Sequence, residues 1–401
     1  MVLSNAQWFA NPSTTYEIDQ SCRFNDDDSA YLYKTPDATN QKTWTFSTWF
    51  KIGNLGINKT FLAAGTDGGG TGAGYTVLRI SDSDEIYFEY YASSAAVWKY
   101  VSNQVLRDPG AWYHLVVAVD TTQGTASNRI KIYLNGSEVT SFSTETDPSA
   151  DTTGNVGKNI LHRVGSSSWG VSSLFDGYMA ETVYIDGTQL TPSSFGETNS
   201  TTGQWVPKSV SGLTFGTEGF LFAYQDSSAL GDDTSGNGND FTSSGLAAAD
   251  QMTDSPTDNF CTWSPIDKDT ATFANGNLQV SSGGSGSTAG CARATFGMAA
   301  GKWYWEGKLT ARDATGTGVF GVIDPAVKMD DDILDEVGAG YGTYSGRLFE
   351  TDSGSSFGTT PSADDFMQVA FDADSGKIWF GLNNTWQASG DPAAGSNPAA
   401  T

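Results

Sequence analysis

Apolar and polar residues alternate with a period of two along many stretches of the chain, which is the pattern of a β-strand with one buried and one exposed face. The alternation is clearest in an earlier group of stretches, residues 43–52, 85–91, 112–120, 130–134 and 178–185. A later group comprises residues 302–309, 318–323, 366–372 and 377–382. The one helical candidate, residues 330–337 (DDDILDEV), is short and acidic. The pattern therefore predicts an all-β protein.

Turn-forming residues separate these stretches. Residues 65–74 (GTDGGGTGAG) form a glycine-rich turn, and Asn135 and Gly136 lie between two apolar runs. Since both residues of an Asn-Gly pair tolerate positive φ, the pair favours a type I′ turn and predicts a β-hairpin over residues 130–139. The composition agrees, because 47 glycines and 12% aromatic residues suit short strands joined by tight turns.

The alternation lapses in the middle of the chain, so the chain divides into domains. A length of 401 residues corresponds to about two domains of roughly 100–200 residues each. Residues 232–240 (DDTSGNGND) and 255–259 (SPTDN) are rich in turn formers. We expect two consecutive antiparallel jelly-roll or β-sandwich domains, with a first sandwich over residues 1–205, a connector with turn-rich segments over 206–260 and a second sandwich over 261–401.

The net charge of -25, from 46 acidic and 21 basic residues, excludes two classes of partner. A strongly negative field repels both nucleic acid phosphates and anionic lipid, so neither nucleic acid nor a membrane is expected to bind. The acidity itself suits solubility in salty surroundings, and a role in binding cations stays open.

Cysteine usage and the amino terminus indicate where the chain folds. Three scattered cysteines, Cys22, Cys261 and Cys291, are too few for a disulfide framework or a zinc site. The first residues, MVLSNAQWFANP, lack the basic and apolar segments of a secretory signal, and no stretch approaches a membrane span. We therefore expect free thiols and folding in a reducing compartment.

Aromatic side chains in loops are the best candidates for ligand contact, because a Trp or Tyr at a loop tip offers a flat apolar face to a sugar ring or a protein. Trp169 lies in a polar stretch between strands, next to Ser168, and Tyr75 borders the glycine-rich turn that contains Asp67. These four residues are the predicted ligand-binding set. The remaining tryptophans that fall in strand patterns are expected in the core: Trp44, Trp49, Trp112, Trp303, Trp305 and Trp379.

Oxygen-rich loops raise the question of calcium. Asp67, Asp151 and residues 232–240 offer carboxylates and carbonyls, which Ca²⁺ prefers. The same residue types are also what tight turns require for backbone reasons alone. Both interpretations stay open, and no metal or other cofactor is assigned.

Three segments in order resemble the laminin-G-like and pentraxin-like branch of the concanavalin A-like superfamily. They are residues 112–120 (WYHLVVAVD), 130–139 (IKIYLNGSEV) and 175–187 (FDGYMAETVYIDG). The resemblance implies a two-sheet sandwich for residues 1–205. In the pentraxins an acidic loop just before the last segment holds calcium, and here that loop reads SSSWG. The calcium site of that family therefore does not carry over.

The later part of the chain resembles a SPRY domain, a two-sheet sandwich used for protein recognition. The resemblance rests on residues 301–306 (GKWYWE) and 364–386 (DDFMQVAFDADSGKIWFGLNNTW). A complete SPRY domain continues with further strands, so the second sandwich is expected to be incomplete at its C-terminal end. The tail over residues 388–401, rich in Ala, Gly, Pro and Ser, is expected to be mobile.

The sequence predicts no enzyme. Glycoside hydrolysis needs two facing carboxylates, and in the glucanases of the resembled fold these acids alternate on one strand with a third acid three residues further on. Glu17 and Asp19 begin such a pattern, but Cys22 takes the third place. A Ser-His-Asp triad would have to use His114 or His162, and neither follows a nucleophile motif.

The whole arrangement resembles uncharacterised virion proteins of marine bacteriophages, carried by residues 1–9 (MVLSNAQWF), 191–205 (TPSSFGETNSTTGQW), 233–241 (DTSGNGNDF), 254–260 (DSPTDNF) and 301–306. The resemblance implies assembly in the host cytoplasm into a virion.

The expected function is a tail fibre, spike or surface appendage that binds host-surface glycan or protein beside other virion proteins. Capsid decoration or tail assembly is the alternative. A homo-oligomer is expected, and a trimer is common for such parts, although no coiled-coil heptads specify one.

Overall fold

The computed structural model describes residues 16–66, 74–282, 290–312, 318–329, 338–350 and 354–401. Every regular element among them is a β-strand or a single 3₁₀ turn, as the period-two alternation predicts. The 3₁₀ turns are η2 (Asp26–Asp28), η3 (Ala126–Asn128), η4 (Pro192–Ser194), η5 (Ala248–Asp250) and η8 (Gln387–Ser389). No helix in the described part is long and apolar enough to cross a membrane. The helical candidate at 330–337 lies outside the described residues.

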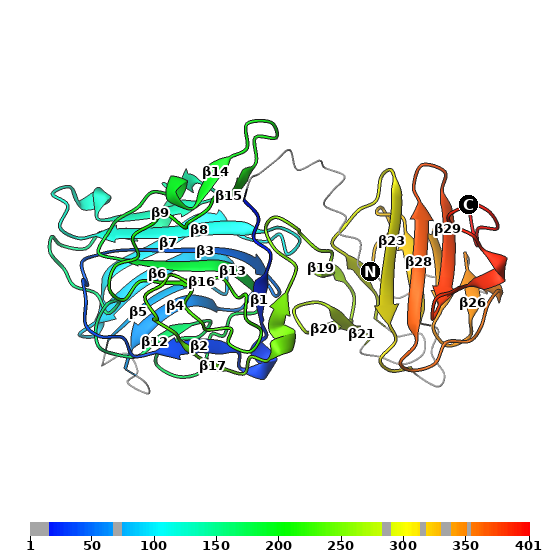
Figure 1. The fold of residues 1–401 in the computed structure, drawn as a ribbon, viewed down its shortest axis with the longest axis horizontal. Helices are drawn as coiled ribbons and strands as arrows, with labels where there is room; N and C mark the ends of the chain where they lie inside the picture. The colour runs from blue at the N-terminus through cyan, green and yellow to red at the C-terminus, as the bar shows by residue number, and fades with distance from the viewer. Residues whose placement is uncertain (1–15, 67–73, 283–289, 313–317, 330–337, 351–353) are drawn as a thin grey trace. The chain divides into compact units, whose positions relative to one another are not determined.

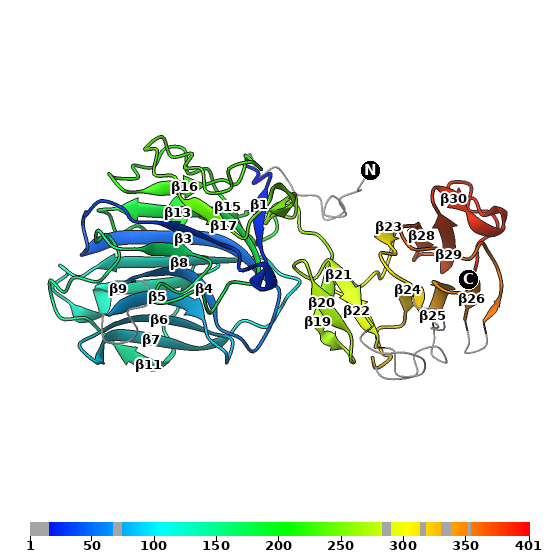
Figure 2. The same ribbon diagram turned by 90° about the horizontal axis from the view of Figure 1, so that it is seen from below.

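The first compact unit contains two large antiparallel sheets, seen from two sides in Figures 1 and 2. The first sheet has the order β10 (Ser137–Glu138), β9 (Ile130–Leu134), β8 (Tyr113–Asp120), β3 (Thr43–Ile52), β13 (Gly177–Asp186), β1 (Ser21–Phe24) and β18 (Gln251–Met252), with β16 (Phe220–Phe222) also paired to β13. The second sheet has the order β11 (Phe142–Thr146), β7 (Ala95–Val105), β6 (Glu85–Ala92), β5 (Tyr75–Ile80), β4 (Lys59–Gly65), β12 (His162–Val164), β2 (Tyr31–Lys34) and β17 (Thr242–Ser244). A separate hairpin joins β14 (Gly196–Thr198) to β15 (Trp205–Pro207).

The expected hairpin at residues 130–139 is confirmed. Strands β9 and β10 pair with Leu134 opposite Ser137, and the turn residues Asn135 and Gly136 both have positive φ, 48° and 78°. This is the backbone that a type I′ turn requires.

The two sheets pack face to face around one core. Side chains that alternate inward from both sheets form it, including Trp44 and Phe46 from β3 and Phe88 and Trp98 from the second sheet. Trp44 and Phe88 meet edge to face with ring centroids 6.0 Å apart. Each such buried aromatic contributes roughly 1.5–3 kcal/mol through removal of its apolar surface from water. The core fixes which face of each strand points outward.

Residues 206–260, expected as a connector, are part of this first unit instead. They supply one strand to each sheet edge and a third to the centre, since β18 pairs with β1, β17 with β2 and β16 with β13. Lys51 of β3 is fully buried, and its Nζ lies 2.9 Å from Asp254 Oδ2. The polar, turn-rich composition of residues 206–260 comes from tight turns between short strands. The segment therefore resembles a linker only in its sequence.

The same segment and its neighbours cover the outer face of the first sheet. Phe195, Val210 and Phe215 pack on outward side chains of that sheet, such as Val183 and Ile185. A smaller cluster, Ile18, Trp49 and Ala180, closes the rest of this face. The central strands β3, β8 and β13 of the first sheet are therefore buried on both sides.

The second compact unit comprises residues 261–273 and 277–401. Its two larger sheets have four strands each: β23 (Lys302–Lys308), β28 (Phe366–Asp372), β29 (Lys377–Leu382) and β30 (Thr385–Trp386), and β24 (Val319–Ile323), β25 (Gly338–Gly342), β26 (Arg347–Phe349) and β27 (Ser355–Ser356). Two small sheets pair β19 (Trp263–Lys268) with β22 (Ala292–Ala294) and β20 (Thr272–Ala274) with β21 (Gln279–Ser281). Val369 and Phe380 from one large sheet and Tyr341 from the other share a core, which makes this unit a sandwich.

The C-terminal tail, expected to be mobile, packs along β29. Residues 399 and 400 pair with Ile378, whose N–H donates to the Ala400 carbonyl over 3.1 Å. Trp379 is buried beneath the tail and donates its Nε1–H to the Ser396 carbonyl over 2.8 Å. The small side chains of the tail thus permit close packing along the edge of β29.

The expected core tryptophans divide into two groups. Trp44, Trp49 and Trp379 are buried, whereas Trp112, Trp303 and Trp305 are only half-buried. Trp303 and Trp305 lie on β23, an edge strand of its sheet, which leaves part of each ring uncovered.

Candidate functional site

The outer face of the second sheet is open over β5, β6 and β7. On β5, Leu78 and Ile80 point into the core, so Tyr75, Val77 and Arg79 point outward; Tyr75 and Arg79 are half-buried, and Val77 between them is buried. Outward side chains of β6 and β7 lie beside those of β5 on the same face of the sheet. This face contrasts with the outer face of the first sheet, which other segments cover over its central strands β3, β8 and β13.

A loop braced by serines holds one aromatic side chain over this face. Ser167 N donates to the Ser172 carbonyl over 3.0 Å, and Ser167 Oγ donates to the Gly170 carbonyl over 2.9 Å. Arg163 reaches the same loop, with Nη1 2.8 Å from the Ser167 carbonyl. These bonds hold Trp169 in place before any ligand binds.

Trp169 forms a short row of rings with two tyrosines. Its ring centroid lies 4.4 Å from that of Tyr75, with the planes tilted by 48°. Tyr75 in turn stacks on its cross-strand partner Tyr91, with centroids 5.5 Å apart and planes 11° from parallel. All three side chains are half-buried, so part of each ring meets solvent.

A carboxylate lies under this row. Glu89 is buried at 4% exposure, and Tyr75 donates its hydroxyl to Glu89 Oε2 over 2.9 Å. The Lys99 Nζ lies 3.7 Å from Glu89 Oε1. Burial and the bond to Glu89 raise the pKa of the Tyr75 hydroxyl well above its usual value. The tyrosine therefore stays a hydrogen-bond donor throughout the physiological pH range.

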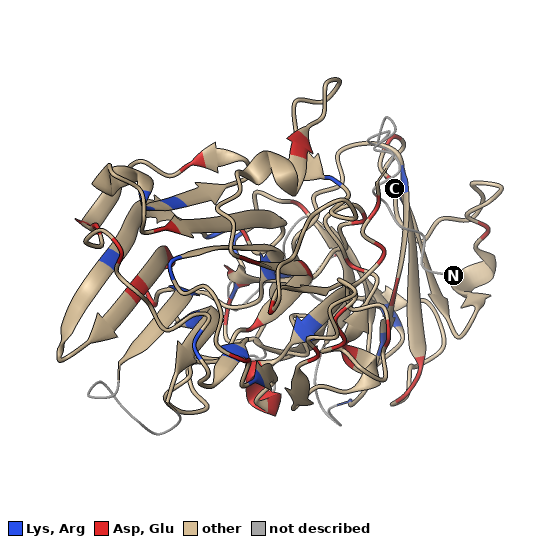
Figure 3. Cartoon of the chain, turned by 60° about the vertical axis from the view of Figure 1, so that its left-hand side comes forward, with Lys and Arg blue, Asp and Glu red and all other residues tan. Residues whose placement is uncertain are grey.

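Two cations flank the next tyrosine along β6. The Arg79 guanidinium lies 4.3 Å from the ring centroid of Tyr87, and the Lys99 ammonium lies 4.8 Å from it. Burial, followed by the charge of Glu89, raises the pKa of the Tyr87 hydroxyl. Figure 3 shows the basic and acidic positions dispersed over the strands and loops of the chain.

The structure brings two of the four predicted ligand-binding residues together, Trp169 and Tyr75. Ser168 lies beneath the loop, fully buried, with an Oγ that has no hydrogen-bond partner. Asp67 lies outside the described residues. The prediction missed Tyr91 and Glu89, although the alternation in residues 85–91 (EIYFEYY) already puts both on the face opposite Phe88.

Residues 25–194 match the sequence model of the concanavalin A-like lectin/glucanases superfamily. The matched segment contains most strands of the sandwich and the whole Trp169 loop. The first unit is accordingly a concanavalin A-like domain.

Comparison with solved structures gives distant likenesses. A Bacteroides ovatus protein named as a carbohydrate binding protein is 17% identical with a TM-score of 0.35, over 57% of this chain and 58% of that chain. A heptameric SAP-like pentraxin from Limulus polyphemus is 14% identical with a TM-score of 0.30, over 44% of this chain and 80% of that one. The CBM40 of the Ruminococcus gnavus IT-sialidase, solved with α2,3-sialyllactose, is 13% identical with a TM-score of 0.28, over 41% and 85%. No curated protein matches the sequence.

The histidines of the concanavalin A-like domain are structural. His114 is fully buried, stacked on Trp49 with centroids 4.4 Å apart. Its Nε2 lies 2.8 Å from Ser47 Oγ, and its Nδ1 accepts a bond from Trp205 Nε1 over 3.0 Å. Burial lowers the pKa of His114 to about 3. His162 is likewise buried, and its pKa is lowered to about 4.

The carboxylates of the predicted pattern do not face one another across a cleft. Glu17 and Asp19 are exposed, and they precede β1 rather than lie on it. Cys22 is fully buried in the core. Glu181 is buried in a β-bulge of β13 with φ of 44°, and it accepts a hydrogen bond from Tyr16. Burial raises its pKa to about 8.

Where the structure describes the oxygen-rich segments, their carboxylates bind groups of the protein itself. Asp233 accepts bonds from the N–H groups of Leu221, Ser235 and Asn239, between 2.8 and 2.9 Å. Asp151 pairs with Lys42 at 2.8 Å. Within the described ranges, no group of three or more His, Cys, Asp or Glu side chains could hold a metal ion.

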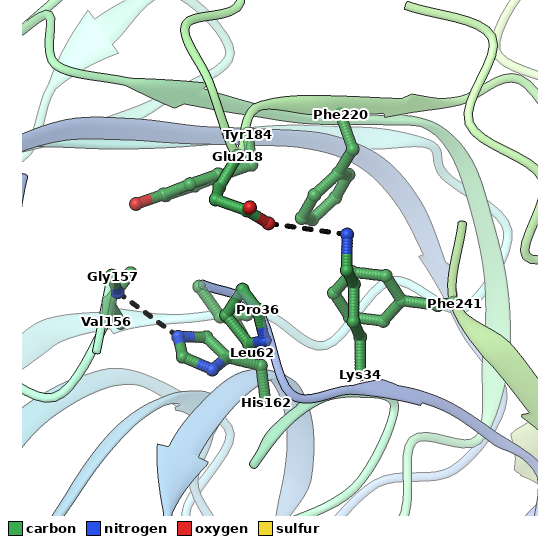
Figure 4. Close-up of a pocket in the computed structure, with 10 residues that line it drawn as sticks. All are labelled: Lys34, Pro36, Leu62, Val156, Gly157, His162, Tyr184, Glu218, Phe220 and Phe241. Carbon is green, nitrogen blue, oxygen red and sulfur yellow. Dashed lines mark hydrogen bonds and ion pairs between the residues drawn. The ribbon is translucent and has the colours of Figure 1, made fainter. Parts of the chain in front are cut away.

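A small cavity lies between the sheets, where residues 218–241 pack against β2 and β12 (Figure 4). Most of its polar groups are paired, since Lys34 Nζ lies 3.3 Å from Glu218 Oε2 and Gly157 N donates to His162 Nε2 over 3.2 Å, whereas the Tyr184 hydroxyl has no hydrogen-bond partner. The remaining space is about that of a water molecule. The cavity is therefore too small for an organic ligand.

Proposed function

We propose that this chain is a glycan-binding protein and that the outer face of the second sheet is its binding surface. The observation that carries the proposal is the row of Trp169, Tyr75 and Tyr91 on an open face, held by a hydrogen-bonded loop. We call these three residues the aromatic row. The match of residues 25–194 to a superfamily of lectins and glucanases supports it.

The chemistry of the aromatic row suits a sugar ring. The C–H face of a pyranose is apolar and packs on an aromatic ring, while its hydroxyls need polar partners at the edge. The Tyr75 hydroxyl donates its proton to Glu89 and keeps lone pairs that can accept a hydrogen bond from a sugar hydroxyl. Because the loop is already braced, little conformational entropy is lost when a ligand binds.

The test is binding of the full chain to an array of bacterial and algal glycans, with affinities then measured in solution. Replacing an exposed aromatic anchor typically costs about 2 kcal/mol, so Trp169→Ala should weaken binding by roughly thirtyfold. The matched control is Tyr344→Ala, an exposed aromatic of the second unit. Normal folding with unchanged affinity in Trp169→Ala would reject the aromatic row as the binding surface.

We further propose that the protein is a bacteriophage virion component, a tail fibre, spike or appendage that attaches to host-surface glycan. The support is the resemblance of residues 191–205, 233–241 and 254–260 to virion proteins of marine phages. The second sandwich, with its SPRY-like segments at 301–306 and 364–386, is proposed to dock to other virion proteins. Antibody labelling of intact particles tests this, since label at the tail supports attachment and label on the capsid favours decoration.

A further inference from the structure

We propose that the glycan bound at the outer face carries a carboxylate, which Arg79 recognises with Lys99 beside it. The inference rests on the proposed glycan-binding function and names the class of sugar. Both cations lie on the same face as the aromatic row, on β5 and β7, the two strands that flank β6.

The Arg79 guanidinium is only partly engaged within the protein, by the ring and the hydroxyl of Tyr87. Its Nε is buried and has no hydrogen-bond partner. No ion pair within 4.0 Å joins its guanidinium to a carboxylate in the described part of the chain. In a chain with 46 acidic and 21 basic residues, an arginine without a carboxylate partner is notable on charge grounds alone.

The surroundings of Arg79 favour a carboxylate over a neutral hydroxyl. The guanidinium lies against the Tyr87 ring, which restricts its orientation and reduces its hydration. A planar guanidinium binds a carboxylate through two parallel hydrogen bonds, a geometry that a single hydroxyl does not match. Glu89 does not fill this role, because its oxygens already meet Tyr75 and Lys99.

The spacing allows one oligosaccharide to reach both halves of the face. Arg79 lies four positions after Tyr75 on β5, and Tyr91 lies four positions after Tyr87 on β6. At about 3.3 Å per strand residue this is about 13 Å, the length of a short oligosaccharide rather than of one sugar. A neutral ring on the aromatic row therefore places a neighbouring acidic ring near Arg79.

The experiment compares carboxylated oligosaccharides with their carboxyl methyl esters. The probes are oligogalacturonate, oligoalginate and sialyllactose, each paired with its ester, and the protein is the full chain. At least one acid should bind about tenfold or more tightly than its ester, because the ester removes a charge-assisted pair of hydrogen bonds. Raising the salt concentration should weaken binding of the acid and leave binding of the ester unchanged.

Variants locate the effect. Arg79→Gln should bring the affinity for the acid down to that for the ester, and Arg79→Lys, which keeps the charge without the planar fork, should be intermediate. Arg347→Gln, an exposed arginine of the second unit, is the control for net charge. Thermal unfolding establishes that each variant folds. If Arg79→Gln does not fold, the reduced preference for the acid is tested with Arg79→Lys instead.

Each result has a distinct meaning. Equal affinity for acids and esters, or an Arg79→Gln variant that keeps the preference, overturns the carboxylate inference and leaves glycan binding intact. Preference for dextran sulfate over every carboxylated probe, lost in Arg79→Gln, replaces the carboxylate by a sulfate and so overturns the stated class. Absence of binding to all saccharides, esters included, refutes the proposed function and the inference together.

Discussion

Trp205 Nε1 donates a hydrogen bond to Nδ1 of His114 over 3.0 Å, and this contact fixes the histidine tautomer. An indole N–H can only donate, so Nδ1 accepts and the ring proton lies on Nε2. Nε2 then donates to Ser47 Oγ at 2.8 Å. A histidine that donates to a serine cannot remove its proton, so the Ser47–His114 pair is not a nucleophile and its base.

Acid should destabilise the first unit through His114. Its pKa is about 3 in the folded protein against 6.5 unfolded, because burial disfavours the charged ring. The unfolded state therefore takes up the proton first as the pH falls, and stability present above pH 6.5 is lost toward pH 3. Urea unfolding at pH 7.5 and 4.5 measures this. His114→Phe should show a smaller loss between the two pH values, and an equal loss would contradict the assignment.

Glu181 should have the opposite effect on stability. Burial raises its pKa to about 8, from 4.5 unfolded, so the folded state keeps the proton that the unfolded state releases. Stability should therefore fall as the pH rises from 4.5 to 8. Glu181→Gln should remove this dependence and stabilise the protein at pH 8, whereas the exposed control Glu197→Gln should change neither. A Glu181→Gln variant less stable than the parent at pH 8 would show that the carboxylate is charged.

Breaking the buried pair of Lys51 and Asp254 tests whether residues 206–260 belong to the first sandwich. Asp254 also accepts bonds from Trp112 Nε1 at 2.9 Å and Phe260 N at 3.1 Å. Asp254→Ala would leave a buried lysine charge uncompensated, at a cost of about 3–5 kcal/mol in unfolding free energy. The control is Asp151→Ala, which breaks the exposed ion pair of Asp151 with Lys42 and should lower the unfolding free energy by about 0–1 kcal/mol. Equal effects of the two substitutions would mean that the segment is a connector.

Alternation alone predicted the all-β class and part of the strands, but it missed β4, β5 and β7 of the second sheet. The predicted range 43–52 coincides with β3, and 366–372 with β28, because each strand buries one face or both against a core. Residues 220–252 escaped prediction because their strands have only two or three residues, too few for a period to show.

The site was half predictable. Trp169 could be proposed from its polar surroundings, whereas its contact with Tyr75 depends on how the loop folds back over the sheet. Arg79 and Tyr87 look like ordinary strand residues in sequence. Their pairing follows from the register of β5 against β6, which places them directly opposite each other.

Gly65 controls the position of the Trp169 loop. A Cβ at this residue would lie 2.6 Å from Ser168 Oγ and 3.2 Å from the Gly74 carbonyl. Gly65→Ala should therefore displace the loop and weaken glycan binding, by about tenfold if the Trp169 contact is largely lost. Ser168→Ala alone removes a buried hydroxyl without a partner and should keep or slightly raise stability. The double variant should recover much of the lost binding, and failure to recover any would contradict this steric account.

Hydroxyl-radical labelling of the full chain, with and without a saturating glycan, tests the central claim most directly. Mass spectrometry then reports which aromatic side chains the ligand shields from oxidation. The account predicts protection of Trp169, Tyr75 and Tyr91, with Tyr304 and Trp386 of the second unit unchanged. Protection confined to the second unit, or a bound glycan that leaves Trp169 fully reactive, would contradict it.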